Sequence, residues 1–486
     1  MVLTVVVAYL VACLWLGIRA GKGSSDTIAG YVAGDRALGP VLMYFITGAT
    51  IFSAFTFLAM PGLAYSQGAA AFYILCYGVL GFVPFYFLGA RAARLGREHG
   101  FITQAELVAE RCGNRWIAGA MALISVLAFV PYLALQVLGA GIVVQVVTRG
   151  MFGFADGIPQ WLGGAICYAI VLAYVLKSGV LGVGWTNMFQ GICMLVLAWT
   201  FGLWLPYHLH GGVGAMFEAI ERARPELLAA PGLAPNGSPS TWMQFSSAVL
   251  ISTIGFSCWP HLFMKAFTAR DERTLKLTVV LYPTFSLFLI PIVLLGFCGV
   301  LFEPRPANAN EVLPHMLMSM QMPGLIVGFF CAGSLAAGMS SGDAIVHAAA
   351  SILVRDGWIT AFRRKMSSSA ERAAVRVFVV VIMAISYALA VIYKGALFQL
   401  LLYAYGPIAQ FAPALVIALC AKRPSGNAVL AGMLAGVAAS LLIKTGVVPV
   451  PWPIHEGLYG LAVNLVVVAL VWIIAPGRRS ESSARA

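Results

Sequence analysis

The sequence contains few charged residues. Asp, Glu, Lys and Arg together make up 10% of its 486 residues, whereas a soluble domain has about 25%. Hydrophobic residues make up 61%, and the mean hydropathy is +0.90. A chain with so little charge cannot cover a surface that faces water, which excludes a soluble protein of this length. We expect an all-α polytopic membrane protein.

Sequence signatures of several other protein classes are also missing. The nine Cys residues include no CxxC pair, so no redox or zinc motif is indicated. The sequence has no HExxH motif and no Walker motif, and we therefore expect neither an enzyme nor an ATP-driven pump. The net charge of +12 is explained by basic loops on one side of a membrane, so no nucleic-acid partner is expected.

Long apolar runs are abundant instead. A helix needs about 20 apolar residues to cross the hydrocarbon of a bilayer, and thirteen runs approach that length. They cover approximately 2–18, 41–66, 70–90, 116–147, 160–176, 182–206, 241–263, 278–302, 323–353, 374–394, 396–420, 427–444 and 455–475. With the N-terminus outside, the inner loops and the cytoplasmic C-terminal tail hold 24 of the 30 Lys and Arg residues, Lys265 among them. The distribution predicts thirteen spans, N-out and C-in.

Three spans contain many small and polar residues. These are 47–62 in the second span, 246–261 in the seventh and 332–343 in the ninth. Close helix packing alone would explain small residues, but Pro260 also removes a backbone donor within its span. Interrupted spans at matching places in two halves indicate an inverted-repeat transporter with a binding site near the membrane centre.

The chain divides accordingly into two predicted five-helix repeats and three flanking or connecting segments. We expect a first helix and cytoplasmic loop over 1–40, and repeats over 41–206 and 241–420. An external loop over 207–240 separates the repeats, with a short amphipathic helix at 213–228, and two accessory helices with a polar tail cover 421–486.

The ninth span carries the sharpest candidates. Ala337, Ser340 and Ser341 stand at i, i+3 and i+4 and share a helix face. Hydroxyls and free carbonyls are suitable Na⁺ ligands, although Ser side chains in membrane helices commonly bond back to the preceding turn. Asp343 follows in the same apolar run, where a carboxylate indicates function. The alternative is that the span ends early and that Asp343 lies in water.

Five segments in this order resemble the sodium:solute symporter family over nearly the whole chain. They are YVAGDRALG (31–39), MPGLAYSQG (60–68), GVGWTNMFQG (182–191), WPH (259–261) and SLAAGMSSGDA (334–344). The resemblance implies a LeuT-type 5+5 inverted repeat with one extra N-terminal and two extra C-terminal helices. It also implies alternating access around a fixed central site.

The same resemblance implies site residues. The Na⁺ site would use the carbonyls of Ala49, Phe52 and Ala337 and the hydroxyls of Ser340 and Ser341. Candidate substrate-binding residues, between the second, fourth, seventh and eleventh spans, are Ser53, Phe55, Thr56, Gln136, Phe256, Trp259 and Gln410.

Three positions depart from the family pattern. Ile51 stands where several members have Asp or Asn, Asn187 where many have Asp, and Asp343 where many have Ser. Asp343 and Asn187 are therefore a candidate second cation site, with the carboxylate moved from the sixth span to the ninth. A buried Asp could bind Na⁺ or a proton, because desolvation penalises its charged form.

We expect Na⁺-coupled symport of a small organic solute, a monocarboxylate or related organic anion, across the bacterial inner membrane by a monomeric functional unit. Na⁺ would be the coupling ion and no prosthetic group is expected. The alternatives are a proton-coupled carrier that uses Asp343 and a transporter-like sensor. The short polar tail after 476 argues against a sensor, since sensors usually carry a fused cytosolic domain.

Overall fold

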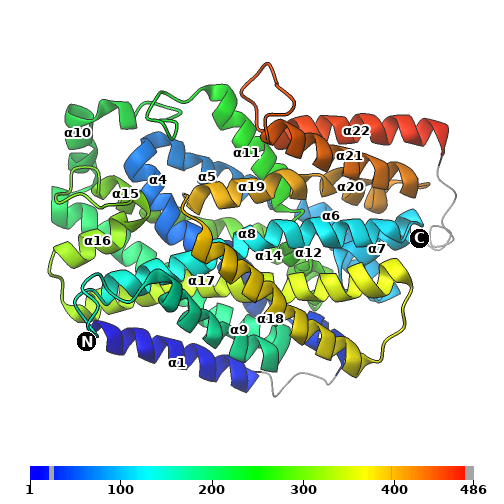
Figure 1. Ribbon diagram of the computed structural model, residues 1–486, viewed down its shortest axis with the longest axis horizontal. Helices are drawn as coiled ribbons and strands as arrows, with labels where there is room; N and C mark the ends of the chain where they lie inside the picture. Colours follow the sequence, from blue (N-terminus) through cyan, green and yellow to red (C-terminus); the bar gives the residue numbers. More distant parts are fainter. Residues whose placement is uncertain (21–26, 396, 477–486) are drawn as a thin grey trace.

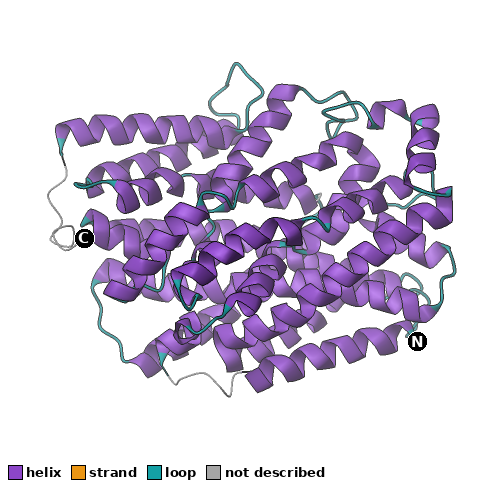
Figure 2. Cartoon of the chain, turned by 180° about the vertical axis from the view of Figure 1, so that it is seen from behind, coloured by secondary structure: helices purple, strands orange, loops and turns teal. Residues whose placement is uncertain are grey.

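The computed structural model describes residues 1–20, 27–395 and 397–476 (Figure 1). Residues 21–26, which include Lys22 of the first predicted inner loop, and the tail 477–486 lie outside the described residues. The described residues form helices and three isolated bridges, without a β-sheet (Figure 2). The predicted all-α class is therefore confirmed.

The helices follow one another with short connections. The first part of the chain forms α1 (Val2–Ala20), α2 (Ile28–Ala33), α3 (Pro40–Ile51), a π-helical turn (Phe55–Ala59), α4 (Met60–Gln67), α5 (Tyr73–Leu80), α6 (Phe85–His99), α7 (Gln104–Cys112), α8 (Trp116–Val147), α9 (Gln160–His210) and α10 (Val213–Ala223). The second part forms α11 (Trp242–Phe256), α12 (Pro260–Phe263), α13 (Lys265–Thr268), α14 (Glu272–Ser286), α15 (Leu289–Cys298), α16 (Val312–Ser319), α17 (Gly324–Ile352), a second π-helical turn (Leu353–Thr360), α18 (Ser368–Ile392), α19 (Leu397–Ala409), α20 (Phe411–Cys420), α21 (Gly426–Lys444) and α22 (Glu456–Ile474).

The chain is a multi-pass membrane protein. Within the described ranges, ten helices are long and apolar enough to cross a membrane, or eleven if the bent pair Trp242–Phe256 and Pro260–Thr268 counts as one span. The predicted number of thirteen is not confirmed by this criterion. The boundaries of the two five-helix repeats also remain predictions.

Helix α9 explains part of the difference between the predicted thirteen spans and the ten or eleven found within the described ranges, because it covers two predicted spans. Its 51 residues would extend about 77 Å if straight, more than twice the hydrocarbon thickness of roughly 30 Å. Gly179 interrupts it with φ 56° and ψ −148°, where a Cβ would lie 2.5 Å from the carbonyl oxygen of Tyr31. Two helices therefore meet at Gly179, and only glycine fits this conformation and this contact.

Helix α17 forms the centre of the molecule. Every residue from Phe330 to Ile352 is buried, and the helix runs through the middle of the bundle, between α1 at one edge and α22 at the other (Figure 1). Its Gly, Ala and Ser content follows from this position, because small residues let neighbouring helices approach closely. The polar residues of the ninth predicted span thus lie inside protein and not against lipid.

A short amphipathic helix, α10, and a short, mostly buried helix, α7, lie at opposite ends of the bundle. The predicted amphipathic segment 213–228 forms α10 and the turn Pro225–Leu227, with Met216 and Ile220 fully buried. Helix α7 lies at the opposite end of the bundle from α10 (Figure 1). The amphipathic pattern of 213–228 therefore predicted helix α10 correctly.

Candidate functional site

The second predicted span is broken after α3. Phe52 is extended (φ −90°, ψ 100°), and the helix resumes only at Phe55. The following N–H groups bond elsewhere: Ala54 donates to Gln136 Oε1 at 2.9 Å and Phe55 to Ser53 Oγ at 3.2 Å. The carbonyls of Thr50 and Ile51 consequently lose their usual helical donors and are free to bind other groups.

Hydroxyls from α17 contact carbonyls at the end of α3, including that of Thr50. Ser340 Oγ donates to the carbonyls of Ala49 at 2.9 Å and Ala337 at 3.1 Å, and Ser341 Oγ donates to the carbonyl of Thr50 at 2.8 Å. All of these residues are fully buried. The structure thus brings together four of the five predicted cation ligands, Ala49, Ala337, Ser340 and Ser341, beside a fifth, Phe52, at the end of α3.

Asn187 lies at the same cluster. Its amide donates to Thr50 Oγ1 and to the carbonyl of Ser340, both at 3.0 Å, while its Oδ1 has no partner among the described residues. The sequence did not predict the contacts of Thr50 with Asn187 and Ser341. A single threonine in an apolar helix is not part of a recognisable pattern.

Asp343 is completely buried, so the alternative that it lies in water is wrong. Its Oδ2 accepts hydrogen bonds from Tyr174 at 2.7 Å and Thr186 at 3.4 Å, and its Oδ1 has no partner among the described residues. Both donors come from α9 and were missed by sequence reasoning. No hydrogen bond joins Asp343 to Asn187 in the described chain; Thr186, the neighbour of Asn187, contacts the carboxylate instead.

Lys265 requires a correction. The sequence places it in an inner loop among solvated charges, but it begins α13 and is only 4% exposed. Within the described ranges its ammonium has no hydrogen bond or ion pair, and it interacts electrostatically with Asp343. A short broken helix, which hydropathy alone cannot separate from a loop, carries this ammonium into the protein interior.

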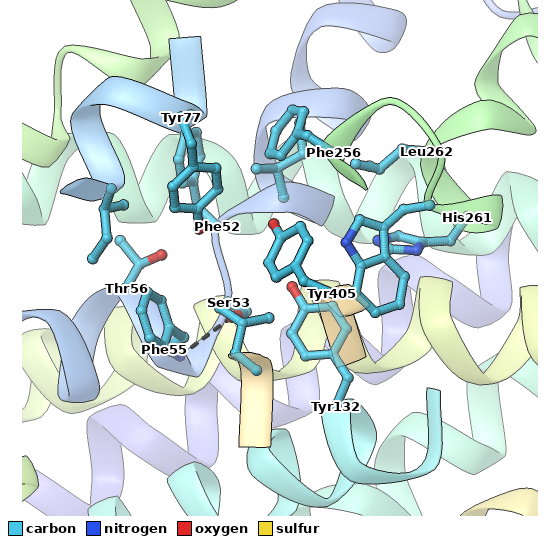
Figure 3. Close-up of a pocket in the computed structure, with 15 residues that line it drawn as sticks. Phe52, Ser53, Phe55, Thr56, Tyr77, Tyr132, Phe256, His261, Leu262 and Tyr405 are labelled. Atoms are coloured by element: carbon cyan, nitrogen blue, oxygen red, sulfur yellow. Dashed lines mark hydrogen bonds between the residues drawn. The ribbon is translucent and has the colours of Figure 1, made fainter. Parts of the chain in front are cut away.

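A narrow cavity lies between the two broken spans (Figure 3). It is nearly closed, with a volume of about 20 Å³, room for about one water molecule. The predicted residues Ser53, Phe55, Thr56, Phe256 and Trp259 line it. Its other walls are Ile51, Phe52, Ile74, Tyr77, Gly78, Tyr132, His261, Leu262, Leu401 and Tyr405. The cavity therefore has a largely aromatic surface with a few hydroxyl groups.

Two predicted substrate residues lie elsewhere. Gln136 bonds the backbone of Ala54 and Tyr132 and thereby holds the first helix break. Gln410 donates to the carbonyls of Gly406 and Gly457, and Asn464 donates to its Oε1 at 3.2 Å. Both amides are thus used in contacts between helices.

The second break differs from its predicted geometry. The sequence suggests that Phe256 and Trp259 share one helical face, but α11 ends at Phe256 and Trp259 is extended (φ −58°, ψ 122°) before Pro260. Proline disfavours helical conformation in the residue that precedes it. The helices on either side are bent by 45°, and both aromatic residues nevertheless reach the cavity.

One motif match has no catalytic meaning. Residues 338–342 read GMSSG, which fits the GxSxG spacing of a hydrolase nucleophile. That nucleophile requires a sharp turn between a strand and a helix, whereas these residues lie inside α17. Their hydroxyls contact carbonyls of α3 instead.

Comparison with known proteins supports the same interpretation. The family model described as "Sodium:solute symporter family" matches residues 31–436. The uncharacterized symporter YhjB of Bacillus subtilis (strain 168) is 28% identical over 90% of this chain and 87% of its own length. The monocarboxylate transport permease of Rhizobium johnstonii is 24% identical over 92% of this chain and 90% of its own length.

Solved structures share the fold. A Na⁺-coupled sialic acid symporter in a substrate-bound outward-open state superposes with a TM-score of 0.78, at 18% identity over 98% of both chains. Mhp1, a nucleobase-cation-symport-1 family transporter, superposes with a TM-score of 0.61, at 16% identity over 94% of this chain and 97% of its own. These similarities establish a LeuT-type transporter fold.

Proposed function

Because the chain belongs to the sodium:solute symporter family, we propose that it carries out Na⁺-coupled symport of a small organic solute. The family consists of transporters, so we propose no enzymatic reaction. Import would proceed by alternating access, in which two groups of helices move around a fixed central site.

The observation that carries the proposal is the hydroxyl–carbonyl cluster between α3 and α17. Na⁺ prefers oxygen ligands that need not be charged, and a helix break supplies them within a membrane. We propose that the carbonyls of Ala49, Phe52 and Ala337 and the hydroxyls of Ser340 and Ser341 bind the ion. Three of these five oxygens are already adjacent, because Ser340 Oγ lies 2.9 Å from the carbonyl oxygen of Ala49 and 3.1 Å from that of Ala337. The hydroxyl of Ser341 contacts the neighbouring carbonyl of Thr50.

The solute would occupy the adjacent cavity. Ser53, Phe55, Thr56, Phe256 and Trp259 contribute to its walls. We propose an organic anion as the substrate, supported by the similarity to the monocarboxylate permease and by the lack of acidic side chains among the described residues of the cavity wall.

The membrane arrangement is proposed from the distribution of basic residues. We propose a bacterial inner membrane location with the N-terminus outside and the C-terminus in the cytoplasm, and a monomeric transport unit. The segments 41–206 and 241–420 would be the two inverted repeats, each opening with one of the broken spans.

Uptake into proteoliposomes tests the proposal. Labelled carboxylates, amino acids and sugars are offered under an inward Na⁺ gradient or a proton gradient. Changing both Ser340→Ala and Ser341→Ala removes two ligands with little loss of volume, so half-maximal uptake should need at least about tenfold more Na⁺. Wild-type Na⁺ dependence in this double variant would refute the cation site.

Proton coupling is the second candidate, and the unpartnered Oδ1 of Asp343 favours it. In that case wild-type uptake would follow the proton gradient and persist without Na⁺. The double change Asp343→Asn with Lys265→Met, which leaves neither buried charge alone, would then abolish accumulation while leaving exchange of solute across the membrane intact.

A further inference from the structure

His261 is an unusual residue for an aromatic cavity wall. It stands one position after the helix-breaking Pro260, is 3% exposed and lines the cavity. Figure 3 shows it across the cavity from Phe55 and Thr56. Its Nδ1 is enclosed without a hydrogen-bond partner, and no partner for Nε2 occurs among the described residues either. Buried polar atoms are normally paired, so this ring calls for a ligand.

The imidazole cannot easily turn away to find another partner. Its centroid lies 5.4 Å from that of Phe129, 6.1 Å from that of Tyr132 and 5.5 Å from that of Trp259. Contacts on three sides fix the ring plane, because aromatic neighbours at these distances pack in defined orientations. The position of its N–H donor is consequently set before any solute arrives.

The charge around His261 favours an anion. Lys265 follows it by four residues along α12 and α13, and the two side chains interact electrostatically. Lys265 also interacts with Asp343 and His347 of α17, which lie outside the cavity lining. Within the described part of the lining there is no Asp or Glu; Asp343, which interacts with Lys265, lies beyond it.

We propose that His261 binds the carboxylate of the transported solute and that Lys265, one helical turn further on, supplies the positive field that makes this end of the cavity selective for anions. The aromatic side chains opposite, including Phe55 and Tyr77, receive the apolar body of the solute. The solute class is thus a small acid with one carboxylate and a compact apolar body. This inference rests on the proposed symport and names the determinant of its substrate.

Binding by the purified full-length protein in nanodiscs tests the inference. Lactate, butyrate and benzoate are compared with lactamide, butyramide and benzamide in Na⁺ buffer, with intrinsic Trp fluorescence as the signal. We expect at least one acid to bind at least tenfold more tightly than its amide. His261→Phe keeps the ring but removes the donor and should weaken that acid about tenfold, since a lost hydrogen bond to a charged group costs that much.

Matched variants separate the donor from mere packing. His261→Gln retains an N–H donor and should stay within about threefold of wild type. The double change Lys265→Met with Asp343→Asn, which leaves no buried charge alone, should weaken acids but not amides. Lys422→Met, at an exposed position, should change neither. Equal binding of acids and amides, no binding of any acid, or unchanged affinity in His261→Phe would each overturn the inference.

Failure of the inference and failure of the proposed function give different results. Na⁺-stimulated uptake of a neutral solute that is insensitive to His261→Phe would refute the role of His261 and leave symport intact. Acid binding that depends on His261 but not on Na⁺ would refute the coupling and leave the carboxylate site intact.

Discussion

After Ile51 the chain leaves its helical path, and the carbonyls of Ala49 and Thr50 meet serine hydroxyls from α17 at 2.8–2.9 Å. After Phe256 the chain leaves its helical path again, but Trp259 and His261 pack against Phe129 and Tyr132. The first break is thus surrounded by neutral oxygens and the second by aromatic rings and basic groups.

The difference shows how one backbone device can serve two ligands. A helix break in a membrane protein exposes backbone groups that must be satisfied. At the first break neighbouring hydroxyls satisfy them and leave an oxygen cluster suited to a metal cation. At the second, Pro260 has no N–H to satisfy, and the space is filled by side chains suited to an organic solute. Substitutions should therefore affect ion and solute separately.

The largest effect, on the yield of folded protein, is expected at Asp343 and Lys265, whose charges interact between the two regions. Asp343→Asn leaves the buried ammonium without the carboxylate that interacts with it, and an uncompensated buried charge is strongly destabilising. We expect little folded protein by size-exclusion chromatography. The double change Asp343→Asn with Lys265→Met should recover much of the folded yield. If the double variant folds no better than the single one, the two charges do not interact in the folded protein.

A smaller effect, confined to the ion, is expected at the first break. Asn187→Leu removes hydrogen bonds to Thr50 and to the carbonyl of Ser340, worth about 1 kcal/mol each. The Na⁺ concentration for half-maximal uptake should rise about 5–30-fold, with KM for solute unchanged at saturating Na⁺. Gln190→Leu, one turn further along α9, is the control and should leave Na⁺ dependence unaltered. An equal rise in both variants would contradict the assignment.

A smaller effect still, confined to the solute, is expected from Tyr405→Phe. The ring lines the cavity and packs against Trp259 at 5.7 Å, so removal of the hydroxyl alone keeps the packing. KM should rise about 2–10-fold if the hydroxyl contacts the solute, and the Na⁺ dependence measured in the same uptake assay should not move. A shift in Na⁺ dependence would mean that the two regions are not separable.

The smallest effect on transport is expected at Gln410. Its hydrogen bonds to Gly457 and Asn464 join it to α22, away from the cavity. Gln410→Leu should lower the melting temperature of the protein. KM and Na⁺ dependence should stay within twofold of wild type, which corresponds to a change in binding free energy below about 0.5 kcal/mol. A large rise in KM would place Gln410 in the substrate path, as the family resemblance implies.

The sequence predicted best what depends on local pattern. Small polar residues in apolar spans located both breaks, and the i, i+3, i+4 spacing of Ala337, Ser340 and Ser341 identified the face of α17 whose two hydroxyls contact α3. The amphipathic period of 213–228 likewise gave α10. These features need only helical geometry, which a sequence displays directly.

Contacts between distant segments could not be predicted from one sequence. Tyr174 donates to Asp343 across 169 positions and Tyr168 donates to the carbonyl of Gly338 across 170, and no periodicity reports such a pair. Lys265 was misplaced for a related reason: α13 is four residues long, so its burial depends on helices packed around it. The resemblance named Gln136 and Gln410 by position, but their side chains bond to other groups.

The first helix has a consequence for how the protein is made. Gly17 of α1 lies against Tyr174, where a Cβ would come within 2.7 Å of the tyrosine, and Tyr9 accepts a hydrogen bond from Gln190. Both partners belong to α9, which is translated roughly 10–30 s after α1 at ordinary elongation rates. During that interval α1 lacks both contacts, and its apolar sequence allows it to remain in the bilayer without them. The tyrosine that contacts Asp343 thus packs against α1 only after α9 has been made.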